Sequence, residues 1–438
     1  MGGKEKISGK VKLAKVTGGY LVRIKLKEGN MEKLAIEGGK PVLEKPLKIE
    51  GKRFGEKEEK LVLEVLRSGK LNKNVGEKVR EFEKKFANYL GVKHAIMSTS
   101  GTAAIHIALG ALNFEPGSEI LTSSITDMGS IIPIFLTLCV PVFADIDEET
   151  WEIDPEDVEK KITPRTKAIL AIHLIGNSCN MKRILEIAKK YNLYVIEDCA
   201  QAFETTFQGK KVGKFGEMGC FSLNQHKHIT CGDGGITVTD DEKLAERARL
   251  FSDKAWPREV GRTSLFVAPN YRVTELQAAV AIAQLDKVVE IGERRNKLGR
   301  LLTDLIKETP GVKVQKSHED SKHTYWFYAF RVPQRIRDKF VEALRAEGVP
   351  ASGGYIPKPV YLYEVFQEKN TFGSSHFPYG FSPFRPSPET VDYKEGDCPV
   401  AEKLLKEMIR IPLNEFWSKE DVEKCAEAIR KVSYWLIS

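Results

Sequence analysis

Lys227 occupies a place in this sequence where a lysine could do covalent chemistry. The apolar segment 219–222 predicts a strand, and the chain leads from it through Lys227 into the glycine-rich segment 232–235. Most of the 68 Lys and Arg residues must be solvated surface groups. A lysine at the end of a buried strand can instead lose its water, and a desolvated amine with a lowered pKa is what Schiff-base chemistry requires.

Two histidines and a cysteine lie beside this lysine. His226, His228 and Cys231 are residue types that bind zinc. No second cluster of ligands accompanies them in the sequence, so we predict no metal site.

Two acids and an amide close another predicted strand, in segment 196–201. Glu197, Asp198 and Gln201 would lie at its carboxyl end, where α/β sheets bind their ligands. They could bind a metal, a sugar hydroxyl or a protonated ring nitrogen. Asp198 could equally have a structural role, by capping the turn that follows.

Ser100, Gly101 and Thr102 lie between a predicted strand and a predicted helix. Small residues with free backbone N–H groups at a helix N-terminus form a ready anion site, although an ordinary N-cap is the simpler interpretation. The sequence contains neither GxGxxG nor GxxxxGK[ST], so it indicates neither a dinucleotide-binding fold nor a P-loop.

The elements that must position these residues alternate between strand and helix from about residue 56. Strands are expected at 94–97, 119–123, 141–144, 168–172, 193–197, 219–222 and 235–239, and helices at 56–68, 76–90, 102–112, 128–139, 181–191 and 274–308. This alternation predicts an α/β fold with a mainly parallel central sheet flanked by helices.

The pattern changes near residue 309. A strand-like segment (325–332), helices at 336–347, 399–408 and 419–434, and an irregular stretch at 353–390 predict a smaller C-terminal α+β domain. We therefore divide the chain into a large domain, 31–308, and a small domain, 309–438. Residues 1–30 alternate apolar and basic positions around Gly18-Gly19, as a β-hairpin would. A disordered extension, or a true start at Met31, explains the pattern equally well.

The net charge of +7 arises in this N-terminal extension. Residues 1–30 contain eight basic and two acidic groups, and the remaining 408 residues contain 60 and 59, so we expect no nucleic-acid partner. The longest apolar stretch, 130–144, is cut by Pro133 and Pro141 and is too short for a membrane span. Seven cysteines without a CxxC pair, and no signal peptide, predict a cytoplasmic protein with reduced thiols.

Taken together, these segments resemble the DegT–StrS family of sugar aminotransferases, which are pyridoxal-phosphate (PLP) enzymes of fold type I. The resemblance runs from about Ile36 to the C-terminus. Its motifs occur in the family's order: GGKP, STSGTAAIHIAL, FADID, AIHLIGN, EDCAQAF, GCFSLNQHKHITCGDGG, NYRVTELQAAVAIAQLDKV and CPVAEKL.

The resemblance implies roles for three of the candidates in holding the PLP ring. Lys227 matches the lysine that forms a Schiff base with PLP. Asp198 matches the carboxylate that keeps the pyridine nitrogen protonated, so that the ring can act as an electron sink. Gln201 falls where the family contacts the 3-hydroxyl of the ring.

Four further residues match the family's phosphate site. Gly101 and Thr102 correspond to the backbone site at the helix N-terminus, and Ser222 to a phosphate-binding hydroxyl. Asn270 matches a residue that reaches the phosphate from a partner subunit, which implies a homodimer with shared active sites.

Asp127 departs from the family pattern, because relatives often carry an aromatic residue there that stacks on the PLP ring. A carboxylate cannot stack. It could instead bind a substrate amine or hydroxyl, or hydrogen-bond a neighbour such as one of the histidines beside Lys227. We expect it to line the cofactor site.

The resemblance implies ping-pong transfer of an amino group from glutamine or glutamate to a nucleotide-linked keto-sugar or a free keto-cyclitol. The freed Lys227 amine would act as general base and acid. Gln225 and segment 359–361 resemble the family members that use glutamine and cyclitols or aminobenzoates more than they resemble the other members. His173, His323 and Tyr361 are candidates for acceptor contacts, although each could be a structural core residue instead.

Two alternatives remain open. Asp127 and the two histidines suggest another PLP reaction on a related carbohydrate, dehydration or epimerisation. Dehydrating relatives carry a histidine in place of the lysine, however, and Lys227 is present. The basic N-terminal extension would suit a non-catalytic regulator that has kept the fold.

Overall fold

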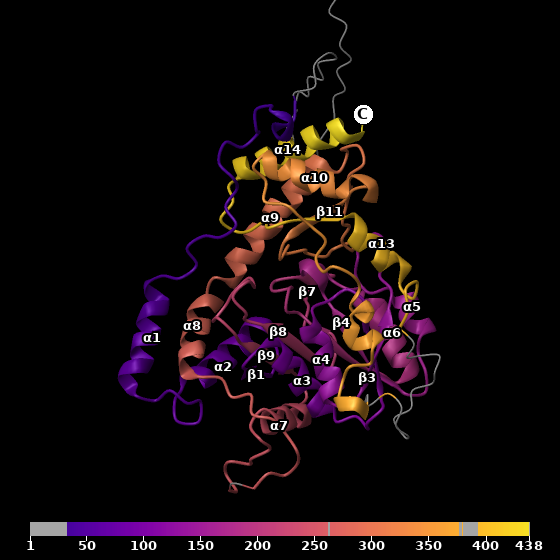
Figure 1. The fold of residues 1–438 in the computed structure, drawn as a ribbon. Coiled ribbons are helices and arrows are strands. Elements are labelled where there is room, and N and C mark those ends of the chain that lie inside the picture. The colour runs from indigo at the N-terminus through magenta and orange to yellow at the C-terminus, as the bar shows by residue number, and fades with distance from the viewer. Residues whose placement is uncertain (1–32, 262, 376–378, 380–392, 438) are drawn as a thin grey trace, which may run out of the picture.

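The computed structural model describes residues 33–261, 263–375, 379 and 393–437 (Figure 1). The hairpin expected within residues 1–30 lies outside the described residues.

A seven-stranded sheet forms the centre of the larger part of the molecule (Figure 1). Its spatial order is β1 (His94–Ser98), β9 (Gly235–Thr239), β8 (Met218–Ser222), β5 (Tyr194–Asp198), β4 (Thr166–Ile172), β2 (Glu119–Ser123) and β3 (Val140–Ala144). The pairs from β8 to β3 are parallel, whereas β9 runs antiparallel to both of its neighbours. The prediction of a mainly parallel sheet is confirmed.

Helices cover both faces of this sheet, because successive strand residues point to opposite sides. Leu170 and Ile196 pack in one core with α3 (Gly101–Leu112), α4 (Met128–Leu136) and α7 (Glu242–Phe251). Ile169 and Val195 pack in another core with α6 (Met181–Tyr191). Towards β1 the second face is covered by α2 (Lys78–Leu90) and α8 (Glu275–Leu285), and α8 also packs on α1 (Glu56–Ser68).

The helix expected over 274–308 is in fact two helices, α8 and α9 (Val288–Ile306). Lys287 lies at the junction between the two helices, and its Nζ donates a hydrogen bond to the carbonyl of Arg53 at 3.0 Å. The helix α5 (Pro155–Lys160), like α7, was not foreseen from the sequence.

A four-stranded antiparallel sheet forms the smaller part, in the order β10 (Lys313–Val314), β11 (Tyr328–Arg331), β13 (Met408–Ile411) and β12 (Ser352–Gly353). Three helices pack with it: α10 (Gln334–Ala346), α13 (Pro399–Glu407) and α14 (Lys419–Ile437). The expectation of a smaller C-terminal α+β region is confirmed.

The hydrophobic core of this smaller part also takes in residues from before position 309. Leu34 and Leu47 lie in it, together with Leu298 and Leu302 of α9. The boundary at 309 therefore remains a prediction, and the N-terminal segment packs with the C-terminal core rather than with the large sheet.

Short elements complete the described part of the chain. They are η1 (Ala35–Glu37), η2 (Leu174–Gly176), β6 (Thr206–Phe207), β7 (Lys210–Lys211), η3 (Val360–Leu362), α11 (Glu364–Gln367) and η4 (Gly373–Ser375). Among the described helices, none combines the length and the apolar character that a membrane span requires.

Candidate active site

A cavity of about 330 Å³ opens at the carboxyl ends of β5 and β8. It brings together all of the cofactor residues predicted from the sequence except Asn270. These are Gly101, Thr102, Asp127, Asp198, Gln201, Ser222 and Lys227. Residues from the smaller part, Trp326 and Tyr355, close its other side.

Lys227 lies in the loop between β8 and β9, and its side chain reaches the cavity. Its Nζ lies 3.9 Å from the centre of the Trp326 ring. Burial lowers the pKa of Lys227 from 10.5 to about 8, although the carboxylates of Asp198 and Asp127 offset part of the shift. A substantial fraction of the amine is therefore neutral near pH 8, as Schiff-base formation requires.

Arg53 holds the backbone of the Lys227 loop. Its Nη1 donates to the carbonyl of Gln225 at 2.7 Å, and its Nη2 donates to the carbonyls of Lys227 and His228, both at 2.5 Å. Sequence reasoning missed this residue, because Arg53 precedes α1 and no local spacing connects it with the loop.

Asp198 ends β5 and is almost fully buried. Its Oδ2 accepts a hydrogen bond from the Ser130 hydroxyl at 2.7 Å, and its Oδ1 accepts one from the Ala200 N–H at 2.9 Å. Asp198 thus fulfils both interpretations of the sequence, since it caps the turn and also faces the cavity. Ser130, on α4, was not identified from the sequence.

Gln201 connects the two sides of the cavity. Its Oε1 accepts a hydrogen bond from the Ile175 N–H at 2.7 Å, and its Nε2 donates to the Tyr355 hydroxyl at 3.1 Å. The amide is therefore held in one orientation at the cavity wall.

The N-terminus of α3 forms a tight cradle beside Ser222. Ser100 caps the helix, with its Oγ accepting a hydrogen bond from the Ala103 N–H at 3.0 Å. A Cβ at Gly101 would lie 2.8 Å from the Cβ of Ser222, and a Cβ at Gly235 would lie 1.9 Å from the carbonyl oxygen of Ser100. Only glycine fits at these positions, and the cradle presents the positive end of a 12-residue helix to the cavity.

Asp127 is the N-cap of α4. Its Oδ1 accepts a hydrogen bond from the Gly129 N–H at 2.7 Å, and the side chain is exposed at the cavity. The alternative of a hydrogen bond to a histidine beside Lys227 is not found among the described residues. His228 is fully buried and its Nε2 contacts the carbonyl of Thr324 at 3.1 Å.

The three candidates for acceptor contacts do not line the cavity. His173 is fully buried, with its Nε2 3.1 Å from Glu197 and its Nδ1 accepting a hydrogen bond from the Cys179 N–H at 3.1 Å. His323 stacks on Tyr325 at 3.7 Å.

Tyr361 is likewise buried, and its hydroxyl donates a hydrogen bond to Glu402. All three side chains therefore have the structural role that the sequence left open, because their polar atoms are engaged within the core.

Asn270 does not line the cavity of its own chain. It precedes α8, and its Oδ1 accepts a hydrogen bond from the Arg272 N–H at 3.3 Å. Its predicted contact with the phosphate of a partner subunit remains a prediction.

One group of metal-ligand types occurs within the described residues: His173, Glu197 and Cys199, whose ligand atoms lie within 4.8 Å of one another. Glu197 already accepts hydrogen bonds from the N–H groups of Gly213, Phe215 and Gly216, at 2.6 to 2.9 Å. These hydrogen bonds give the Glu197 carboxylate a structural role.

The chain belongs to the DegT/DnrJ/EryC1/StrS aminotransferase family, whose model matches residues 52–380. It is 34% identical over 394 residues to the spore coat polysaccharide biosynthesis protein SpsC of Bacillus subtilis, covering 86% of this chain and 95% of that protein. It is 33% identical to the GDP-perosamine synthase of Caulobacter vibrioides, covering 82% and 91%.

A solved structure agrees with this assignment. The aminotransferase from Psychrobacter cryohalolentis superposes with a TM-score of 0.77 at 29% identity, covering 88% of this chain and 98% of that one. The fold is therefore fold type I, as expected from the sequence.

Proposed function

We propose that this protein is a PLP-dependent aminotransferase that moves an amino group from glutamine or glutamate to a nucleotide-linked keto-sugar or to a keto-cyclitol. The observation that carries the proposal is the desolvated Lys227 amine, which faces a cavity lined by Asp198 and by the N-terminus of α3. Membership of the aminotransferase family and similarity to a GDP-perosamine synthase support it.

The residues of the cavity fit PLP. The α3 cradle and Ser222 suit a phosphate, because a helix N-terminus attracts anions and a side chain at Gly101 would fill the space. The buried Asp198 carboxylate suits a protonated ring nitrogen, and Lys227 suits the aldehyde. When bound, PLP would supply an electron sink for the carbanion that transamination generates.

The chain's own residues would then move protons and exclude water. A Lys227 amine with a pKa of about 8 can both take up and release a proton near neutral pH, as a general base and acid must. Trp326 covers one side of the Lys227 nitrogen and would reduce the access of water to it. Ser130 and the Ala200 N–H fix the Asp198 carboxylate, so that its charge is already oriented.

The proposal extends to assembly and location. Asn270 would complete the phosphate site of a second copy of this chain, which makes the protein a homodimer with shared active sites. We place it in the cytoplasm, since its seven cysteines include no CxxC pair and are typical of reduced thiols.

The visible absorption spectrum of the purified protein with PLP tests the proposal. We expect a band from the Lys227 Schiff base, and bleaching of that band by L-glutamine or L-glutamate, each added alone. Lys227→Ala should abolish the band, and Lys84→Ala, at an exposed position on α2, should leave it unchanged.

Other results would favour the alternatives. A band that responds to neither amino acid would favour dehydration or epimerisation and would contradict amino transfer from these donors. Failure of the intact protein to form a band would favour a non-catalytic regulator.

A further inference from the structure

The Asp127 carboxylate has an oxygen atom that the protein itself does not use. Asp127 caps α4, and its Oδ1 accepts the hydrogen bond from the Gly129 N–H. Among the residues that the structure describes, no hydrogen bond engages Oδ2 and no ion pair engages the carboxylate. The side chain is exposed and lines the same cavity as Lys227, so this oxygen is available to a ligand there.

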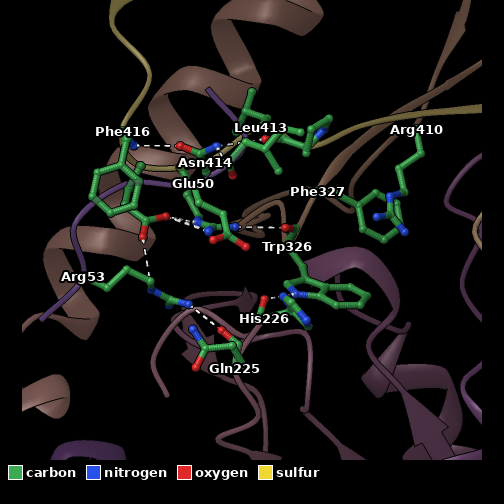
Figure 2. Close-up of a pocket in the computed structure, with 14 residues that line it drawn as sticks. Glu50, Arg53, Gln225, His226, Trp326, Phe327, Arg410, Leu413, Asn414 and Phe416 are labelled. Carbon is green, nitrogen blue, oxygen red and sulfur yellow. Dashed lines mark hydrogen bonds and ion pairs between the residues drawn. The ribbon is translucent and has the colours of Figure 1, made fainter. Parts of the chain in front are cut away.

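The arginines near the site lie in a different pocket from Asp127. This neighbouring pocket shares His226 and Trp326 with the cofactor cavity. Figure 2 shows the three arginines that line it: Arg53, Arg295 and Arg410. Asp127 is not among its lining residues, and Arg295 pairs instead with Glu415 at 2.6 Å. The charge of Asp127 is therefore not paired with these guanidinium groups.

Tyr355 offers a group that complements the Asp127 carboxylate. It comes from the smaller part and lines the cavity, and its hydroxyl oxygen accepts a hydrogen bond from Gln201 Nε2 at 3.1 Å. Within the described part of the chain, no acceptor is found for the hydroxyl proton. Burial, together with the carboxylates of Asp127 and Asp198, raises the pKa of Tyr355, so the hydroxyl stays protonated and can donate.

Asp127 and Tyr355 face the same limited space. Both line the cavity of about 330 Å³, and the charge of Asp127 acts on both Tyr355 and Lys227. This volume lies at the lower end of the range of small-molecule sites, roughly 300 to 1,000 Å³. PLP would take up part of it, so an acceptor group that contacts Asp127 would lie close to the carbonyl that is aminated.

We propose that Asp127 and Tyr355 together bind one hydroxyl group of the acceptor, on a carbon beside its carbonyl. A hydroxyl can donate to the carboxylate and accept from the tyrosine at the same time. An ammonium group only donates, and a phosphate or carboxylate would be repelled by Asp127. An aromatic side chain, which relatives often carry at this position, would offer no such acceptor oxygen.

This inference rests on the proposed aminotransferase function and specifies its acceptor. The keto-sugar or keto-cyclitol would carry a hydroxyl group beside the carbon that receives the amine. Asp127 would then be a residue that determines specificity for the acceptor, in addition to its role as the N-cap of α4.

The kinetic test uses two ketones that differ by one hydroxyl group, 2-hydroxycyclohexanone and cyclohexanone. The protein is loaded with pyridoxamine 5′-phosphate, and the return of the visible band reports amination of the ketone. The preference is the ratio of the two second-order rate constants, and its comparison between variants cancels the different intrinsic reactivities of the ketones. We expect Asp127→Ser to lower the preference about tenfold, because a hydrogen bond to a charged group is lost.

The variants separate recognition of the hydroxyl group from capping of the helix. Serine also caps a helix but brings no carboxylate, so Asp127→Ser should keep α4 intact. Asp241→Ala is the matched control, because the exposed Asp241 caps α7 and does not line the cavity, and the preference should not change. Tyr355→Phe should also lower the preference. The double variant should lower it by less than the product of the two single effects, because both residues bind the same hydroxyl group.

A binding measurement that needs no turnover accompanies the kinetics. The probes are cyclohexanol and cyclohexylamine, which present a hydroxyl and an ammonium group on the same ring. Their Kd values are measured by ligand-observed NMR for the intact protein and for Asp127→Ser, both with pyridoxamine 5′-phosphate and without it. We expect cyclohexanol to bind at least as tightly as cyclohexylamine, and to bind more weakly to Asp127→Ser.

Three results would overturn the inference. The first is a preference that Asp127→Ser leaves unchanged, including equal slowing of both ketones. The second is binding of cyclohexanol that Asp127→Ser does not weaken. The third is tighter binding of cyclohexylamine than of cyclohexanol, lost in Asp127→Ser, which would assign Asp127 to an ammonium group.

Failure of the proposed function would be recognised separately. If glutamine and glutamate do not bleach the band, or if no band forms, amino transfer from these donors fails. The NMR titration of the cofactor-free protein still decides whether Asp127 binds a hydroxyl group, and it alone decides if neither ketone restores the band.

Discussion

The indole N–H of Trp326 donates a hydrogen bond to the backbone carbonyl of His226 at 2.7 Å, directly before Lys227 in the chain. The same indole covers the Lys227 nitrogen at 3.9 Å. Trp326 precedes β11 of the smaller part, whereas the Lys227 loop joins two strands of the large sheet. The reacting lysine is thus covered on one side by a residue from the smaller part of the molecule.

The lowered pKa of Lys227 predicts the pH dependence of cofactor binding. Schiff-base formation requires the neutral amine, so the rate of reconstitution with PLP should rise with pH and level off above a midpoint near 8. An ordinary lysine, with a pKa of 10.5, would still be almost fully protonated there. The rate is followed by the growth of the visible band between pH 6 and 10.

Lys227→Ala is the control for this profile, since it should show no band at any pH. A midpoint above 10 in the intact protein would contradict the burial of the amine.

Asp127→Ala should loosen the start of α4. Loss of a side-chain N-cap costs about 1 kcal/mol, so amide protection in the first turns of α4 should fall about fivefold in hydrogen exchange of the cofactor-free protein. Asp127→Asn keeps a capping oxygen and should preserve most of the protection. Equal protection in Asp127→Ala and in the intact protein would show that the bond to the Gly129 N–H does not stabilise the helix.

Ser222→Ala and Ser100→Ala should separate binding of the phosphate from capping of the helix. The Ser222 hydroxyl lies against the α3 cradle, so its loss should weaken PLP binding by about tenfold with little effect on α3. Ser100→Ala removes the cap and should instead reduce hydrogen-exchange protection in α3. PLP affinity is measured by equilibrium dialysis, and an unchanged affinity in Ser222→Ala would remove this serine from the cofactor site.

Arg53→Lys should retain the positive charge beside Glu415 but should lose the hydrogen bonds that fix the backbone of the Lys227 loop. The three N–H donors of a lysine lie on one nitrogen, so they do not match the carbonyls of Gln225 and Lys227 as the two nitrogens of the guanidinium fork do. We expect weaker PLP binding and a slower rise of the visible band, with the rate constant affected more than its pH midpoint.

Arg53→Gln, which also removes the charge, serves as the comparison. If Arg53→Lys reconstitutes at the rate of the intact protein while Arg53→Gln does not, charge alone would account for the role of Arg53.

Most of the large sheet could be predicted from the sequence. The strands at Glu119–Ser123 and Gly235–Thr239 agree with the structure residue for residue, because short apolar runs bounded by turns are local signals. The prediction of a single helix over 274–308 was wrong. The structure has two helices there, α8 and α9, and the division between them is accompanied by contacts of Lys287 with residues far away in the chain.

Like the fold, the site has a part that could be predicted from the sequence and a part that could not. Asp198 and Gly101 lie at the end of a strand and at the start of a helix, and Lys227 lies in the loop that follows a strand, so local pattern and family resemblance together were sufficient to identify them. The sequence by itself determined the alternation of strand and helix and the residues that meet at the sheet edge, because both follow from local periodicity and from the geometry of parallel strands.

Only the tertiary structure decided what surrounds them. Trp326 and Arg53 reach the site from outside the large sheet, and no spacing in the chain predicts a contact between segments so far apart. It also placed His173 and Tyr361 in the core, because burial of a polar side chain depends on partners such as Glu197 and Glu402 that only folding brings within hydrogen-bond distance.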